Sequence, residues 1–179
     1  MASIAELLSA ARRRSFVGRE LEIQLFESQL VASVPDFVLL YIYGAGGEGK
    51  TTLLKHLTEI CSSFKIRSLN LDAREVDAHP VAFLESLRNS LGKSIHAGQD
   101  VYEALTQLEG RSVLFIDTYE KISPIDDWVR SDFLPKLPTN ILTVICGRNP
   151  PSVAWLSDAG WKALMRHIQL RSFSTVESE

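Results

Sequence analysis

The chain has 179 residues, and 45% of them are hydrophobic, enough for one domain with a sizeable core and too many for a wholly disordered protein. The 19 Lys and Arg residues stand against 22 Asp and Glu, so the net charge of −3 lacks the basic excess of a nucleic-acid-binding surface. Two cysteines exclude a disulfide framework, and no apolar run has the length of a membrane span. We therefore expect a cytoplasmic domain without a membrane or nucleic-acid partner.

Apolar periodicity predicts helices and strands in alternation along the chain. Residues 1–14 are expected to form a helical extension, and a second helix should follow with Leu21, Leu25 and Phe26 on one face. Strands are predicted at residues 37–43, 64–72, 111–120, 139–148 and 166–173. Further helices are predicted at residues 50–61, 81–91 and 100–108. This order predicts an α/β fold with a doubly wound, mostly parallel five-stranded sheet flanked by helices.

A glycine-rich turn follows the first predicted strand, in the segment VLLYIYGAGGEGKTTLLKHL. Gly44, Gly49, Lys50 and Thr51 match every fixed position of the phosphate-binding pattern G-x-x-x-x-G-K-[ST], between a strand and a helix. Glycines let backbone N–H groups approach phosphate oxygens, the helix N-terminus favours an anion, Lys50 neutralises the outer phosphates, and Thr51 offers a hydroxyl to Mg²⁺. The residues expected to bind the nucleotide are Gly44, Ala45, Gly46, Gly47, Glu48, Gly49, Lys50, Thr51 and Thr52. The fold is therefore predicted to be that of a P-loop NTPase.

An acidic residue is needed near the metal if the nucleotide is to be hydrolysed. The buried segment VLFID ends at Asp117, at the edge of the sheet where parallel strands place their ligands, so Asp117 is the candidate second Mg²⁺ ligand. Glu120 lies three residues further and reaches the same pocket if the chain turns sharply. It either orients the attacking water as a general base or is an exposed loop acid, and the sequence leaves both readings open.

The strand ILTVICGR ends at Arg148. A cation at that strand end would lie beside the γ-phosphate, because strand ends converge on the crevice where the ligand binds. Arg148 is therefore the candidate sensor of the γ-phosphate. The predicted catalytic set is Lys50, Asp117, Glu120 and Arg148.

With these motifs in this order, the chain resembles the STAND class of P-loop NTPases, the signal-transduction ATPases related to AAA+ proteins. The segment FVGRE at residues 16–20 is similar to the motif that lies against adenine and ribose in that class. The resemblance implies that Val17, Gly18 and Arg19 line the base pocket. The segment DTYE departs from the paired acidic residues common in the family, which leaves the identity of the catalytic base open.

The resemblance implies an ATP- and ADP-binding, Mg²⁺-dependent switch domain at residues 15–179 that hydrolyses ATP slowly in isolation. Several segments between LDAREVD and LRSFSTVES resemble bacterial members of the family. The last of them is similar to the segment where the family's helical lid begins. The chain is thus expected to be part of a longer protein, with further domains of that protein as partners and homo-oligomerisation on activation.

Other P-loop proteins are the alternatives. A small-molecule or nucleotide kinase shares the loop, although no arginines cluster after residue 120 to form its lid. An AAA+ DNA-associated ATPase is disfavoured by the acidic balance. A GTPase is weaker still, because no [NT]-K-x-D motif occurs to read guanine.

Overall fold

The structure of the chain, a computed structural model, describes residues 3–4, 19–92 and 95–171. Its strands are β1 (Leu39–Tyr43), β2 (Arg67–Asp72), β3 (Ser112–Asp117), β4 (Ile141–Gly147) and β5 (Met165–Gln169). Its α-helices are α2 (Glu20–Val31), α3 (Lys50–Ser63), α4 (Pro80–Leu91), α5 (Val101–Thr106), α6 (Asp126–Trp128), α7 (Val153–Ser157) and α8 (Ala159–Leu164). Shorter helical turns are the 3₁₀ segments η1 (Ala73–Glu75), η3 (Tyr119–Ile125) and η5 (Leu134–Lys136) and the π-helical turn η4 (Val129–Phe133).

The five strands form one sheet in the order β2-β3-β4-β1-β5, and every pairing is parallel. The α/β prediction is therefore confirmed. Parallel pairing places the carboxyl ends of all five strands at one edge, so β1, β3 and β4 end on the same side. Strand β4 lies between β1 and β3. The loop that follows β1 and the carboxylate at the end of β3 consequently belong to strands that are not hydrogen-bonded to each other.

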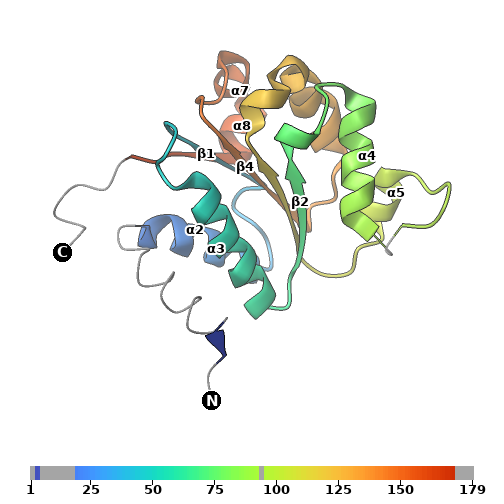
Figure 1. The fold of residues 1–179 in the computed structure, drawn as a ribbon, viewed down its shortest axis with the longest axis horizontal. Coiled ribbons are helices and arrows are strands. Elements are labelled where there is room, and N and C mark those ends of the chain that lie inside the picture. Colours follow the sequence, from blue (N-terminus) through green and yellow to red (C-terminus); the bar gives the residue numbers. More distant parts are fainter. Residues whose placement is uncertain (1–2, 5–18, 93–94, 172–179) are drawn as a thin grey trace.

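Two apolar layers bury the two faces of the sheet. Helices lie on both sides of it (Figure 1). Alternate residues of one strand point to opposite faces, as in β1, where Leu39 and Tyr41 join one layer and Leu40 and Ile42 join the other. Helices α2 and α3 cover the second of these faces. Helices α4, α5 and α7 and the turns after β3 cover the first. The result is a three-layer α/β/α domain whose strand ends stay open to ligands.

The predicted elements that fall within the described residues are confirmed in kind and differ at their ends. Strand β2 starts three residues later than expected because Lys65 has a φ of 57° in the turn that follows α3. Strand β3 stops at Asp117 because Thr118 adopts a φ of 58°, which ends the extended backbone. The extension predicted at residues 1–14 lies outside the described residues except for Ser3 and Ile4.

Helix α2 buries only part of the expected face. Phe26 is buried and Leu25 packs partly buried against the same core, as expected, whereas Leu21 is 80% exposed. Gln29 and Leu30 complete the buried face. A glutamine can occupy this face because its side-chain oxygen accepts a hydrogen bond from the backbone N–H of Asp36 at 2.9 Å. Because Gln29 is polar, the apolar periodicity did not include it in the predicted stripe.

The two cysteines are buried, as the sequence predicted. Burial raises the pKa of the Cys61 thiol to about 12 and that of the Cys146 thiol well above its ordinary value, so both remain neutral hydrophobic groups at neutral pH. In the described part of the chain, no helix combines the length and the apolar character that crossing a bilayer requires.

Candidate functional site

The turn after β1 has the backbone conformation that its glycines predict. Gly47 and Gly49 have φ values of 87° and 80°, which other residues adopt only with strain, and Gly49 immediately precedes α3. Gly44 is needed for a different reason, because a β-carbon there would lie 2.6 Å from the carbonyl oxygen of Leu170. The loop therefore curls tightly in front of the N-terminus of a fourteen-residue helix, a position that favours anions.

Lys50 lies across this loop. Its ammonium group donates hydrogen bonds to the carbonyl oxygens of Gly44 at 2.7 Å and Ala45 at 2.6 Å. The positive charge is thereby held where the loop's glycines and the helix N-terminus also favour negative charge. This arrangement suits the outer phosphates of a nucleotide.

Thr51 and Asp117 meet although 66 positions separate them in the chain. The Thr51 hydroxyl donates to the Asp117 Oδ2 atom across 3.1 Å. Two adjacent ligands of an octahedral Mg²⁺ ion with bonds near 2.05 Å would lie about 2.9 Å apart, so these two oxygens fit that ion. Within the described residues no group of three or more His, Cys, Asp or Glu side chains is arranged to hold a metal, so phosphate oxygens or water would have to complete the coordination.

A sharp turn at Thr118 brings Glu120 into the same region. Thr118 has the left-handed φ of 58°, which is an outlier for a β-branched residue, and its N–H donates to Asp117 Oδ1 at 2.7 Å. The Glu120 carboxylate then reaches the end of β4, where its Oε2 accepts from the backbone N–H of Arg148 at 3.0 Å. Its other oxygen lies 3.3 Å from Arg148 Nε. The turn that Glu120 required is therefore present.

A cavity of about 350 Å³ joins these groups at the carboxyl edge of the sheet. Its lining consists of Gly46, Gly47, Gly49, Lys50, Thr51, Thr52, Arg74, Asp117, Thr118, Glu120 and Arg148. Nine of these residues are ones that the sequence predicted for the site, brought together from the turns after β1, β3 and β4. Gly44, Ala45 and Glu48 belong to the loop but are not part of the lining. Sequence reasoning missed Arg74, because only the sheet order brings the end of β2 beside this cavity. Thr118 was expected only to hydrogen-bond nearby, and it lies in the lining because it directly follows Asp117.

Arg19 takes a place outside that lining. Its guanidinium is buried and donates to the backbone oxygens of Arg171 at 2.6 Å and Glu48 at 3.4 Å, and it pairs with Glu22 at 3.4 Å. The side chain thus links the start of α2 to the phosphate loop and to the end of β5. Val17 and Gly18, the other residues of the predicted base pocket, lie outside the described residues.

A partly buried carboxylate next to the site also escaped the sequence reasoning. Asp126 accepts hydrogen bonds from Tyr119 Oη at 2.7 Å, Trp155 Nε1 at 2.8 Å and Ser152 Oγ at 3.1 Å. Burial, and next the charge of Asp126, raises the pKa of Tyr119 far above its ordinary value, so this phenol is a permanent donor. The network fixes the segment that carries Glu120.

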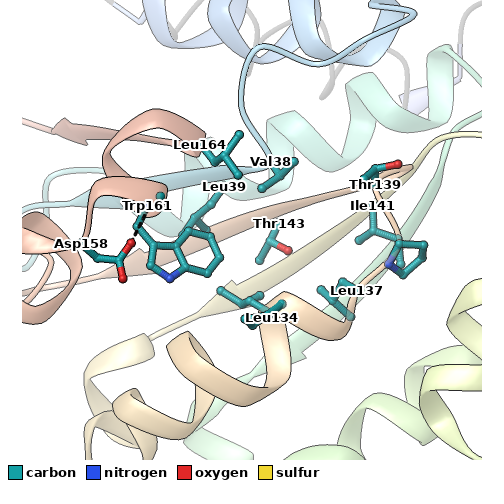
Figure 2. A pocket seen from close by; sticks show the side chains of 13 residues that line it. Val38, Leu39, Leu134, Leu137, Thr139, Ile141, Thr143, Asp158, Trp161 and Leu164 are labelled. Carbon is teal, nitrogen blue, oxygen red and sulfur yellow. Dashed lines mark hydrogen bonds between the residues drawn. The ribbon is translucent and has the colours of Figure 1, made fainter.

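A second cavity, of about 290 Å³, lies near the opposite end of the central strands and has a different character (Figure 2). Its walls are apolar, with Leu39, Leu134, Trp161 and Leu164 among the side chains that line it, and Asp158 is its one charged lining residue. An apolar lining whose one charged residue is a carboxylate disfavours a phosphate. The nucleotide chemistry therefore belongs to the cavity at the carboxyl edge.

No protein-family model matches the chain, and no curated protein matches it. Several solved structures, however, are similar to the chain in fold. The structure of Drosophila ORC bound to DNA has a TM-score of 0.67 at 19% identity over 97% of this chain and 48% of that one. Cdc6p from Pyrobaculum aerophilum has a TM-score of 0.65 at 18% identity, and the match covers 89% of this chain and 47% of Cdc6p. The replication initiator DnaA bound to AMPPCP and single-stranded DNA has a TM-score of 0.53 at 16% identity, and the match covers 88% of this chain and 49% of DnaA.

The chain therefore spans about half the length of the solved chains that it resembles. At these identities the likeness concerns the fold. The narrower STAND resemblance is not confirmed by it and stays a prediction. What the comparisons add to the geometry is the architecture: the chain has the P-loop NTPase fold that these solved structures share.

Proposed function

We propose that the chain is a Mg²⁺-dependent ATP- and ADP-binding domain with weak ATPase activity, acting as a nucleotide switch. The observation that carries this proposal is the contact between the Thr51 hydroxyl and the Asp117 carboxylate, because it joins the phosphate loop to an acidic strand end in one cavity. Lys50 supplies the charge for the outer phosphates. Neither the loop nor the acid alone would distinguish an ATPase from a simple phosphate site.

Each residue of the site has a proposed role that follows from its position in the cavity. Bound Mg²⁺ would neutralise phosphate charge and orient the terminal phosphate, with Thr51 and Asp117 as its protein ligands. Glu120 would accept the proton of the attacking water or orient that water, and Arg148 would face the γ-phosphate from the end of β4. The ion pair between Glu120 and Arg148 must open before either side chain can act alone, which favours slow turnover.

Binding can be tested by calorimetry with Mg·ADP and with Mg·AMPPCP, an analogue that is not hydrolysed. Lys50→Ala removes a charge-assisted contact worth roughly 1.5–3 kcal/mol and is expected to weaken both affinities by one to two orders of magnitude. Lys55→Ala removes the same charge from an exposed position on the same helix and should leave them unchanged. Equal affinities of Lys50→Ala and the parent chain would overturn the proposal.

The preference for adenine over guanine is tested by a competition titration against labelled ADP. We propose that ATP displaces labelled ADP far better than GTP does, since the chain resembles adenine binders at FVGRE and lacks a guanine-reading motif. Equal displacement by GTP would contradict the adenine assignment.

Two more specific functions fit this site. The STAND switch has the support of the sequence motifs, while a DNA-associated ATPase has the support of the neighbours, because the structures of Drosophila ORC and of DnaA contain DNA. We propose the DNA-associated ATPase as the first to test, against the indication of the acidic net charge. Fluorescence anisotropy with single- and double-stranded DNA at fixed salt, in Mg·ADP and in Mg·AMPPCP, separates the two. A dissociation constant above about 10⁻⁴ M in every condition would be weaker than ordinary non-specific binding and would favour the STAND switch.

A kinase would consume ATP by transferring phosphate to an acceptor. We expect inorganic phosphate to account for all the ATP consumed, because the proposed reaction uses water as its nucleophile. ATP loss without phosphate release would favour the kinase instead.

A further inference from the structure

Arg74 is held by a carboxylate at the end of the edge strand β2. Its Nε and Nη2 atoms donate to the Asp72 carboxylate, with Nε at 3.0 and 3.1 Å from the two oxygens and Nη2 at 2.5 Å from Oδ2. Its backbone N–H donates to the same group at 3.0 Å. Hydrogen bonds from Arg74 also lower the pKa of the Asp72 carboxyl, which therefore stays ionised throughout the neutral range. The guanidinium thus has a defined orientation although its side chain is 61% exposed.

The sheet places this arginine beside the metal-binding carboxylate. Strands β2 and β3 pair in parallel, and Asp72 stands opposite Asp117 in their register. Arg74 follows two residues later, in the turn η1, and lines the cavity that contains Lys50 and Asp117. It follows the edge strand β2, which carries none of the motifs that identified the site.

The part of the guanidinium that Asp72 does not use remains able to bind an anion. An arginine has five N–H donors in a planar fork, and Asp72 occupies the edge formed by Nε and Nη2. The Nη1 atom has no acceptor among the described residues. The edge formed by Nη1 and Nη2 can therefore donate to two oxygens of one phosphate while Asp72 keeps its hold.

Two arginines flank Asp117 from opposite sides. Strand β3 lies between β2 and β4, so Arg74 approaches the cavity from one neighbouring strand and Arg148 from the other. A terminal phosphate attached to a metal ion at Asp117 would lie between these two guanidinium groups. Lys50, by contrast, lies in the phosphate loop itself.

We propose that Arg74 is a ligand of the γ-phosphate that makes the site distinguish ATP from ADP, with Asp72 as its positioning residue. This inference rests on the proposed nucleotide-binding function. ADP lacks the group that Arg74 contacts, so the arginine stabilises the ATP state alone and biases the switch towards it.

The test compares the ratio of two affinities, for Mg·AMPPCP and for Mg·ADP, by calorimetry. Arg74→Gln is expected to lower this ratio about tenfold or more while the affinity for ADP changes less than about twofold. Asp72→Ala, which frees the guanidinium, should lower the ratio by a smaller factor. Arg67→Gln is the matched control, because Arg67 is an exposed arginine at the other end of the same strand. It removes an equal charge and should leave the ratio unchanged.

The outcomes separate this inference from the function on which it rests. A parent chain that binds neither nucleotide contradicts the proposed function itself. A parent chain that binds both, with an unchanged ratio in Arg74→Gln, overturns only the role of Arg74. An equal loss of both affinities in Arg74→Gln also overturns it, since that result would show a general electrostatic effect. Thermal unfolding of each variant confirms that the comparison is made between folded proteins.

Discussion

The Glu120 carboxylate binds Arg148 twice, by accepting the backbone N–H at 3.0 Å and by lying 3.3 Å from Nε. One contact fixes the end of β4 to the turn after β3, and the other pairs the candidate base with the candidate sensor. Because the Arg148 side chain is 68% exposed, solvent weakens the pair, and a γ-phosphate could draw the guanidinium away. The two residues are therefore expected to act as one unit in hydrolysis.

Glu120→Gln should lower ATP turnover about 100-fold or more and leave the affinity for Mg·ADP within about twofold of the parent value. Glutamine keeps an oxygen that can accept from the Arg148 N–H, so the turn should remain, while the ability to take a proton is lost. Phosphate release under single-turnover conditions measures the effect. Glu109→Gln, at an exposed position near the start of β3, serves as the control. Unchanged turnover in Glu120→Gln would make Glu120 the loop acid of the alternative interpretation.

Asp117→Asn should reduce the part of the nucleotide affinity that depends on Mg²⁺. The variant loses the negative charge beside the Thr51 hydroxyl, and a hard divalent cation prefers a carboxylate to an amide. We expect the ratio of ADP affinity with Mg²⁺ to that with chelator to fall about tenfold or more. Asp127→Asn is the control, because that carboxylate is 86% exposed and pairs only with Arg130 among the interactions described. An unchanged ratio would remove Asp117 from the metal site.

Much of this site could be predicted because its motifs are local. Four fixed positions of the phosphate loop and the strand-to-helix context identified the loop, and an apolar run ending in an acid identified Asp117. Arg74 could not be found in this way, since its place beside Asp117 depends on the register of β2 with β3. A parallel pairing between segments that are 45 residues apart leaves no trace in either segment alone.

The turn at Thr118 shows a second limit of the sequence. Threonine favours extended backbone, so nothing in DTYE predicts the left-handed φ that ends β3 and redirects Glu120. The network that fixes this turn uses Asp126, Ser152 and Trp155, which come from later parts of the chain. Backbone strain of this kind is stabilised by tertiary contacts and becomes visible only with them.

Two glycines of the phosphate loop should differ in their tolerance of a methyl group. A β-carbon at Gly44 would lie 2.6 Å from the Leu170 carbonyl oxygen and would also collide with the Glu48 carboxylate. A β-carbon at Gly46 would meet no atom within 4 Å. Gly44→Ala should therefore lower the free energy of unfolding by about 1–3 kcal/mol, and Gly46→Ala should change it by less than about 0.5 kcal/mol. Urea unfolding measures both, and equal stabilities would contradict the close approach of Leu170 to the loop.

Tyr119→Phe should destabilise the domain by about 1.5 kcal/mol, because it removes a hydrogen bond to the partly buried Asp126 carboxylate and adds nothing in its place. Tyr102→Phe is the matched control, since its hydroxyl has no hydrogen-bond partner among the described residues. Urea unfolding should place the two variants at least about 1 kcal/mol apart. Tyr119 also precedes Glu120, so the loss of its anchor should loosen the turn and lower phosphate release while ADP affinity stays the same. A destabilised variant with parental turnover would show that Asp126 supports the fold without positioning Glu120, and a variant as stable as Tyr102→Phe would contradict the structural role of this hydrogen bond.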